Sequence, residues 1–193
     1  MFYWFTGVTN HINDSANTIV GDNSIYDWEL EHSIVKKNYK GNDLNGPNCY
    51  KLLKLSREFT DILPEEHKIF GLALQKLYEV VSDCFGMQLN ELRYKKSIQD
   101  FEAIYRQLPH AKDPEKHLSV TIKAHCIFQH IPETIELTGK SLGIFSTQAF
   151  ESVHYDFLET WKRFKYPENH KDYPSQLFKA TVNYNSYHVC DGL

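Results

Sequence analysis

Apolar residues recur at helical spacing in two neighbouring stretches in the middle of the chain. Both repeat the intervals four, three, four and three, which place the apolar residues on one face of a helix. The first stretch consists of Phe70, Leu74, Leu77, Val81 and Cys84, and the second of Tyr94, Ile98, Phe101, Tyr105 and Leu108. Gly86 separates the stretches and Pro109 follows the second. The pattern predicts an antiparallel αα-hairpin of two helices, over residues 65–86 and 89–108.

Weaker versions of the same periodicity predict further helices on both sides of the hairpin. We expect them over residues 25–35, 47–59, 118–131, 148–164 and 174–189. The β-branched run that begins at Val120 leaves a strand open as the alternative at the start of the third of these segments. Pro132 is expected to end that segment, because proline has no N–H for a helical hydrogen bond. The sum is an all-α fold, a helical bundle of about six helices from about residue 46 onward.

The first residues of the chain do not show this periodicity as clearly. Residues 1–24 are rich in polar side chains, and asparagine competes with the backbone for hydrogen bonds and so disfavours a long helix. The asparagines are Asn10, Asn13, Asn17 and Asn23. We therefore expect an irregular N-terminal arm with one short helix over residues 1–45, and a single α-helical domain over residues 46–193.

The composition narrows the class of protein. The chain has 193 residues, of which 41% are hydrophobic and 14% aromatic, and this is typical of a globular rather than a disordered protein. No apolar run approaches the roughly 18–20 residues of a membrane-spanning helix, and no basic segment precedes the N-terminal apolar residues as in a signal peptide. The four cysteines lack the CxxC spacing of zinc motifs. We expect an intracellular protein with reduced thiols and no membrane partner.

Charge is distributed unevenly along the chain. Residues 1–35 contain five acids and no Lys or Arg, whereas residues 36–57 contain six cations and one acid. Such a basic segment either contacts phosphate groups or forms solvated helix faces, and both interpretations stay open. A second basic strip, residues 161–166, alternates cations with aromatic rings that can stack on bases. The candidate nucleic-acid contacts are Lys36, Lys37, Lys40, Lys51, Lys54, Arg57, Lys162, Arg163 and Lys165.

Potential metal ligands gather between residues 125 and 154. Glu151 and His154 are three residues apart, so they project from one face of a helix. An ExxH pair of this kind is half of a di-iron carboxylate site, but the sequence has no second pair. A metal site of His125, Glu151 and His154 is therefore an alternative to histidines that are simply hydrogen-bonded between helices.

Three stretches, taken together in this order, resemble a group of transposon-encoded eukaryotic proteins. The first is LNGPNCYKLLK at residues 44–54, and the second is VVSDCFG at residues 80–86. The third contains IKAHCIFQHIP at residues 122–132 and TGKSLGIFSTQAFESVH at residues 138–154, and the similarity ends near residue 186. The chain thus resembles the C-terminal region of a cut-and-paste transposase of the DDE type.

The resemblance carries expectations about function. A DDE transposase holds Mg²⁺ with three carboxylates, and Glu151 is the position that matches the last of them. No β-branched strand followed by a catalytic Asp precedes residue 45, so we expect no cofactor and no independent catalysis, with Mg²⁺ bound only by a complete parent enzyme. The expected protein is a nuclear helical fragment that packs on a transposase core or on another copy. The alternatives are a free-standing α-helical module that binds DNA or protein, and a metal-dependent enzyme.

Overall fold

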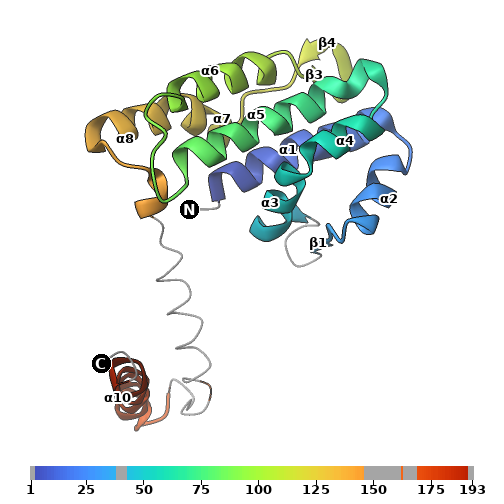
Figure 1. The fold of residues 1–193 in the computed structure, drawn as a ribbon. Helices are drawn as coiled ribbons and strands as arrows, with labels where there is room; N and C mark the ends of the chain where they lie inside the picture. The colour runs from blue at the N-terminus through green and yellow to red at the C-terminus, as the bar shows by residue number, and fades with distance from the viewer. Residues whose placement is uncertain (1–2, 38–42, 146–161, 163–168, 191–193) are drawn as a thin grey trace. The chain divides into compact units, whose positions relative to one another are not determined.

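The fold was analysed in a computed structural model that describes residues 3–37, 43–145, 162 and 169–190 (Figure 1). The described residues are mostly helical, which confirms the all-α class. The chain divides into two compact units, Met1–Phe145 and Ser146–Leu193, and each is described by itself. The first unit contains the predicted hairpin and the hydrophobic core.

The chain opens with a long helix, α1 (Tyr3–Val20), so the expectation of an irregular N-terminal arm is wrong. An apolar seam of Phe5, Val8, Ile12 and Ala16 is almost completely buried. The intervals of three, four and four residues are helical, and burial of this seam outweighs the low helix propensity of the intervening asparagines. Several polar side chains of α1 donate hydrogen bonds back to carbonyls four residues earlier, as Thr9 does to Phe5 (2.8 Å).

Helix α1 belongs to the same core as the central hairpin. It contacts α5 (Lys68–Cys84), α3 (Gly46–Lys54) and α7 (Ile122–His125). Figure 1 shows α1 in blue alongside α5. The compact unit therefore starts with α1, and the expected domain boundary at residues 45/46 does not separate an arm from a core.

The central hairpin has the predicted form. Helix α5 follows a single 3₁₀ turn, η2 (Glu65–His67), and α6 spans Tyr94–Tyr105. The two helices run side by side in opposite directions (Figure 1). All ten residues of the two predicted seams are buried, among them Leu77 and Phe101 at 0% exposure. The helical periodicity thus identified the two faces that form the centre of the core.

Asp83 closes the turn between α5 and α6. Its carboxylate accepts hydrogen bonds from Asn90 Nδ2 (2.9 Å) and Ser97 Oγ (2.5 Å), and its carbonyl accepts one from the Asn90 N–H (3.1 Å). The Asp83 side chain is buried and has lost its hydration water. These donors replace the hydrogen bonds that the water would make. The connection between the two helices is therefore fixed by side chains as well as by its length.

The helices between α1 and the hairpin are shorter than expected. Helix α2 spans Ser24–Glu31, and the predicted helix over residues 47–59 is divided into α3 and α4 (Ser56–Ile62) at Leu55. Pro47 lies in the first turn of α3, where its missing N–H costs nothing. The predicted inner face of Cys49, Leu52, Leu53 and Ser56 is buried.

Gly71 on α5 allows α4 to approach closely, because a Cβ there would collide with Thr60.

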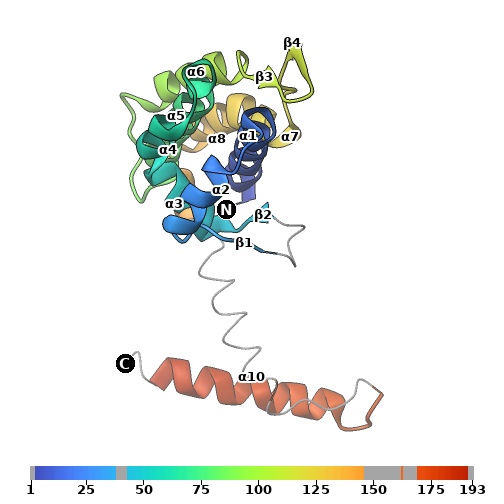
Figure 2. The same cartoon turned by 90° about the vertical axis from the view of Figure 1, so that its right-hand side faces the viewer.

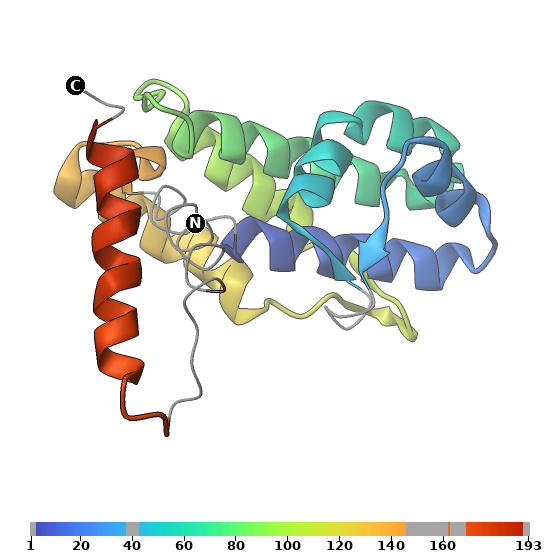
Figure 3. The same ribbon diagram turned by 90° about the horizontal axis from the view of Figure 1, so that it is seen from below.

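Two short antiparallel ribbons interrupt the helices. Strand β1 (Lys36–Lys37) pairs with β2 (Asp43–Leu44), and β3 (Pro109–His110) pairs with β4 (Asp113–His117). Figures 1 and 2 place the two ribbons on different sides of α1, and Figure 3 shows the β1–β2 ribbon beside α1. Residues 38–42, between β1 and β2, lie outside the described residues.

The predicted segment 118–131 takes a different form. It begins as extended chain, forms one turn of α7, widens into a π-helix, η3 (Cys126–His130), and continues as α8 (Ile131–Thr138). Pro132 does not end the helix but lies in the first turn of α8, so that prediction is wrong. The π turn bonds the Ile131 N–H to the Cys126 carbonyl, five residues earlier, and the chain continues past the proline.

The end of the first unit is fixed against the hairpin turn. Gly139 ends α8 with a left-handed φ of 63°, which glycine adopts without strain. Ser141 Oγ then contacts two carbonyls of the hairpin turn, Cys84 O (2.8 Å) and Gly86 O (2.6 Å), just before the 3₁₀ segment η4 (Leu142–Phe145).

The second unit contains α10 (Tyr173–Cys190), which confirms the predicted last helix. The helix expected over residues 148–164 lies outside the described residues apart from Lys162.

The buried hairpin seam gives a test of the core. We expect Leu77→Ala or Phe101→Ala to lower the free energy of unfolding by about 2–5 kcal/mol, because each leaves a cavity between packed helices. Leu92→Ala is the matched control, since Leu92 is 96% exposed in the turn of the same hairpin. Chemical denaturation followed by circular dichroism measures all three variants. Equal stability of Leu77→Ala and Leu92→Ala would contradict the assigned core.

Candidate nucleic-acid interface and its support on helix α1

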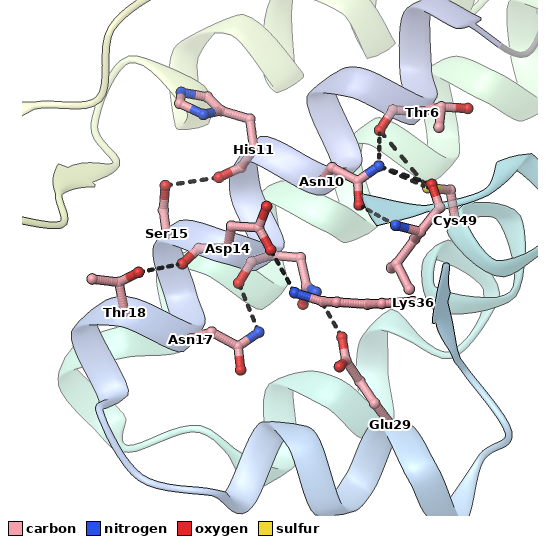
Figure 4. Close-up of polar contacts among 12 residues, drawn as sticks. Thr6, Asn10, His11, Asp14, Ser15, Asn17, Thr18, Glu29, Lys36 and Cys49 are labelled. Carbon is pink, nitrogen blue, oxygen red and sulfur yellow. Dashed lines mark hydrogen bonds and ion pairs between the residues drawn. The ribbon is translucent and has the colours of Figure 1, made fainter. Parts of the chain in front are cut away.

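The basic segment of residues 36–57 does not act as one surface. Lys36 turns inward from β1, and its Nζ lies 2.7 Å from Asp14 Oδ1 on α1 (Figure 4). The Lys36 side chain is only 22% exposed. One of the predicted phosphate contacts is therefore occupied by an internal ion pair, which joins the acidic and basic parts of the sequence.

Three other cations of this segment face the solvent. Lys51 and Lys54 on α3 and Arg57 on α4 are exposed, and we call them the cationic edge. Within the described residues none of the three forms an ion pair. Lys54 Nζ lies 5.3 Å from the centre of the Tyr50 ring, within the range of a cation–π contact. Among the described residues, no ion-paired carboxylate has to be displaced from the cationic edge before an external anion can bind.

The two nearest acids in sequence, Glu58 and Asp61, both lie on α4, and neither forms an ion pair with Arg57 among the described residues. Glu58, next to Arg57, lies 3.4 Å from His32 Nε2, and the His32 ring stacks on Trp28. Lys51 and Lys54 are three residues apart on α3, so they are neighbours on its surface, and Arg57 follows on α4 after the break at Leu55. Three exposed cations against one exposed acid without an ion pair, Asp61, leave this surface with a net positive charge.

The backbone that precedes the cationic edge is held by Asn10 of α1. Asn10 Nδ2 donates to the Leu44 carbonyl (3.0 Å), and Asn10 Oδ1 accepts from the Leu44 N–H (2.8 Å). The amide thus pairs with β2 as a neighbouring strand would. Asn10 and Leu44 are both buried, so these bonds replace water that the Leu44 peptide group has lost. Asn45 then caps α3 by accepting from the Asn48 N–H (3.0 Å).

A second buried polar pair ties α2 to α1. Asn13 Nδ2 donates to Glu29 Oε1 at 2.6 Å, and both side chains are buried. Burial raises the pKa of Glu29, while the hydrogen bond from Asn13 and the nearby Lys36 act in the opposite direction without cancelling the rise. Glu29 therefore gives up its proton less readily than an exposed glutamate.

The buried thiols are not candidates for nucleophilic chemistry. Burial raises the pKa of both Cys49 and Cys84 to about 12, so neither is a thiolate at neutral pH. Cys49 Sγ instead lies near the Leu44 carbonyl (3.6 Å), beside Asn10. Cys49 thus serves the packing around β2, and Cys84 lies in the buried seam of α5.

The remaining predicted contacts are placed only in part. Lys37 lies in β1 and Lys162 is exposed in the second unit. The other predicted residues lie outside the part of the chain that the structure describes, and they are Lys40, Glu151, His154, Arg163 and Lys165. Glu151 as a catalytic residue, and the set of His125, Glu151 and His154 as a metal site, thus stay predictions.

His125 lies beside a different histidine from the one expected. Its ring centre is 5.2 Å from that of His130, and His130 Nδ1 is 3.0 Å from Glu133 Oε2. All three side chains are solvent-accessible around the π turn. Among the described residues, no group of three or more His, Cys, Asp and Glu side chains is arranged to hold a metal ion.

The sequence interpretation missed the polar face of α1. Asn10 and Asn13 were counted only as poor helix formers, although they lie between the apolar residues of a helical seam. That seam was the available signal, because asparagines inside an amphipathic helix must face either water or a buried partner. Here they face β2 and α2.

Comparisons of the chain with protein-family models, with curated protein sequences and with solved structures gave no match. Among the described helices, none combines the length and apolar character that crossing a bilayer requires.

The two hydrogen bonds between the Asn10 amide and the Leu44 peptide group, which we call the Asn10 clamp, predict a specific loss of stability. Asn10→Ala leaves the buried Leu44 N–H without its acceptor, and we expect the free energy of unfolding to fall by about 1–3 kcal/mol. Asn17→Ala is the control, because the Asn17 amide bonds only to a carbonyl of its own helix (3.0 Å). We expect that variant to stay within about 0.5 kcal/mol of the parent in urea denaturation. Equal losses in both variants would argue against the clamp.

Glu29 predicts a pH dependence. The pKa of Glu29 is raised in the folded state, so the folded chain binds the Glu29 proton more tightly than the unfolded chain does. The contribution of Glu29 therefore lowers the free energy of unfolding as the pH rises from the ordinary glutamate pKa past the raised one. Glu29→Gln keeps an oxygen for Asn13 Nδ2 and removes the charge. We expect a higher Tm than the parent at pH 7.5, and a smaller difference at pH 4.5.

The control for this experiment is Glu31→Gln, which removes an exposed carboxylate from the same helix. A Glu29→Gln variant that is less stable than the parent at pH 7.5, with Glu31→Gln unchanged, would show that the Glu29 charge is stabilising instead.

Proposed function

We propose that this chain is a helical binding module, without catalysis of its own, that holds the phosphate backbone of DNA through Lys51, Lys54 and Arg57. The observation that carries the proposal is the exposure of these three cations without an ion-pair partner among the described residues. Phosphate oxygens are the anions that such a strip would meet on a nucleic acid.

The hydrogen bonds that fix the backbone before the cationic edge favour a binding role. Asn10 and the Asn45 cap fix the start of α3, so Lys51 and Lys54 project from a backbone that is already ordered before an anion arrives. Binding then has little backbone entropy to overcome. Arg57 adds a planar group that can bond two phosphate oxygens at once.

Three phosphate contacts define the expected kind of binding. Contacts to phosphate do not distinguish bases, so the module binds without strong sequence preference. Each neutralised phosphate contributes about −0.9 to the slope of log K against log salt concentration on duplex DNA. The cationic edge therefore supplies a slope of about −2.7, and affinity falls roughly 40-fold between 50 and 200 mM salt.

We also propose that the module derives from a transposase, as the resemblance of residues 44–54, 80–86 and 122–154 implies. Its partners would then be DNA and a transposase core or a second copy, and it would act in the nucleus. Mg²⁺ would belong to the complete parent enzyme. A genomic reading frame upstream with Asp-bearing strands would support this origin, and an unrelated upstream frame would contradict it.

DNA binding can be tested by fluorescence anisotropy with a labelled 20-base-pair duplex between 50 and 200 mM salt. We expect the triple variant Lys51→Gln, Lys54→Gln, Arg57→Gln to bind at least tenfold more weakly than the parent at 50 mM salt. Its salt slope should be smaller by two to three, because about three counterion-releasing contacts are lost.

The matched control changes the same amount of charge elsewhere. Lys68, Lys95 and Lys96 each pair with an acid on the surface of the same unit, namely Glu65, Glu136 and Asp100. We expect the triple Gln variant of these lysines to keep the parent's slope. Equal weakening by both triple variants would mean that net charge alone drives binding, and a parent without measurable binding would refute the proposed function.

A further inference from the structure

The π turn between α7 and α8 brings two histidines together. His125 and His130 are five residues apart, and in a regular α-helix residues at this interval point in clearly different directions. In the π-helix Cys126–His130 the backbone bonds join residues five apart, so each such residue lies nearly above its partner. The two exposed imidazoles accordingly meet edge to face, with an interplanar angle of 85°.

We propose that His125 and His130 form a binding site for a divalent transition-metal ion such as Zn²⁺ or Cu²⁺. The separation of the rings fits this use. With a metal–nitrogen bond of about 2.0–2.1 Å, each ring centre lies about 3.2 Å from the ion, and two rings at a tetrahedral angle then have centres about 5.2 Å apart. The ring centres of His125 and His130 are 5.2 Å apart.

Glu133 prepares His130 for this role as a positioning residue. Its carboxylate Oε2 lies 3.0 Å from His130 Nδ1, so Nδ1 carries the proton and Nε2 is left as the nitrogen that can bind a metal. A carboxylate behind a ligating histidine also fixes the orientation of its ring. Glu133 is three residues after His130 and lies in the first turn of α8, next to Pro132.

The site offers two protein ligands, and solvent completes the coordination. This agrees with the finding that no three ligating side chains converge among the described residues. Zn²⁺ and Cu²⁺ both accept imidazole nitrogen, and Cu²⁺ binds such a site more tightly. The proposal does not depend on the cationic edge, since no residue is shared between them.

The test is calorimetric titration of the metal-stripped full chain with Zn²⁺. We expect one site per chain, at least tenfold weakened by His125→Ala or His130→Ala. Glu133→Gln should weaken binding about tenfold, because it removes the charge behind His130 but neither ligand. Titration with Cu²⁺ and electron paramagnetic resonance should show coupling to two nitrogens in the parent and to one in each single-histidine variant.

The control is the double variant His67→Ala, His117→Ala, which removes two histidines outside the π turn. We expect it to bind Zn²⁺ like the parent. A parent that takes up no Zn²⁺, or His125→Ala and His130→Ala variants that bind as the parent does, would overturn the proposal. Circular dichroism distinguishes loss of binding from loss of fold, and both histidines are exposed, so all variants should keep the parent's helical signal.

Discussion

The first unit depends on how one buried peptide group obtains its hydrogen bonds. Leu44 brings a strand residue into a helical core, where its N–H and C=O have no neighbouring strand on the α1 side. A buried peptide group without partners costs more than an ordinary hydrogen bond contributes, and Asn10 satisfies both atoms with one amide. This contact holds β2 against α1, and Asn45, the next residue, caps α3, from which Lys51 and Lys54 project.

The same helix also separates the charges of the basic segment into two groups. Asp14 on α1 neutralises Lys36, and Glu29 lies close enough to Lys36 to be influenced by it. Further along the chain, Lys51, Lys54 and Arg57 are exposed, and in the part of the chain that the structure describes none of them is ion-paired with an acid. A net count over residues 36–57 therefore overstates the available positive charge and hides where it is concentrated. An internal ion pair organises the ribbon, and the unpaired cations define the candidate interface.

Helices whose apolar residues recur at regular helical spacing could be predicted from the sequence. A helix that carries buried polar side chains between its apolar residues, as α1 does, could not. The α5–α6 hairpin and α10 were predicted because apolar spacing and the flanking prolines and glycines agree. Helix α1 was not predicted, because the low helix propensity of its asparagines argues against a helix and the seam of Phe5, Val8 and Ile12 argues for one. In the structure the burial of the seam decides. For the site, exposed lysines could be named but not sorted, because whether Lys36 turns to Asp14 depends on a contact between residues 22 positions apart.

The π turn between α7 and α8 could not be predicted from apolar periodicity. A π turn shifts the helical phase by one residue, so the apolar positions before and after it no longer fit a single repeat. Pro132 gives a reason for irregular hydrogen bonding near this point, since its nitrogen cannot donate. It does not explain why the residues that become neighbours are two exposed histidines, one of them bonded to a carboxylate. The backbone bonds of the π turn do not involve the side chains at 125 and 130, and the paired imidazoles are the feature of this turn that the proposed metal site accounts for.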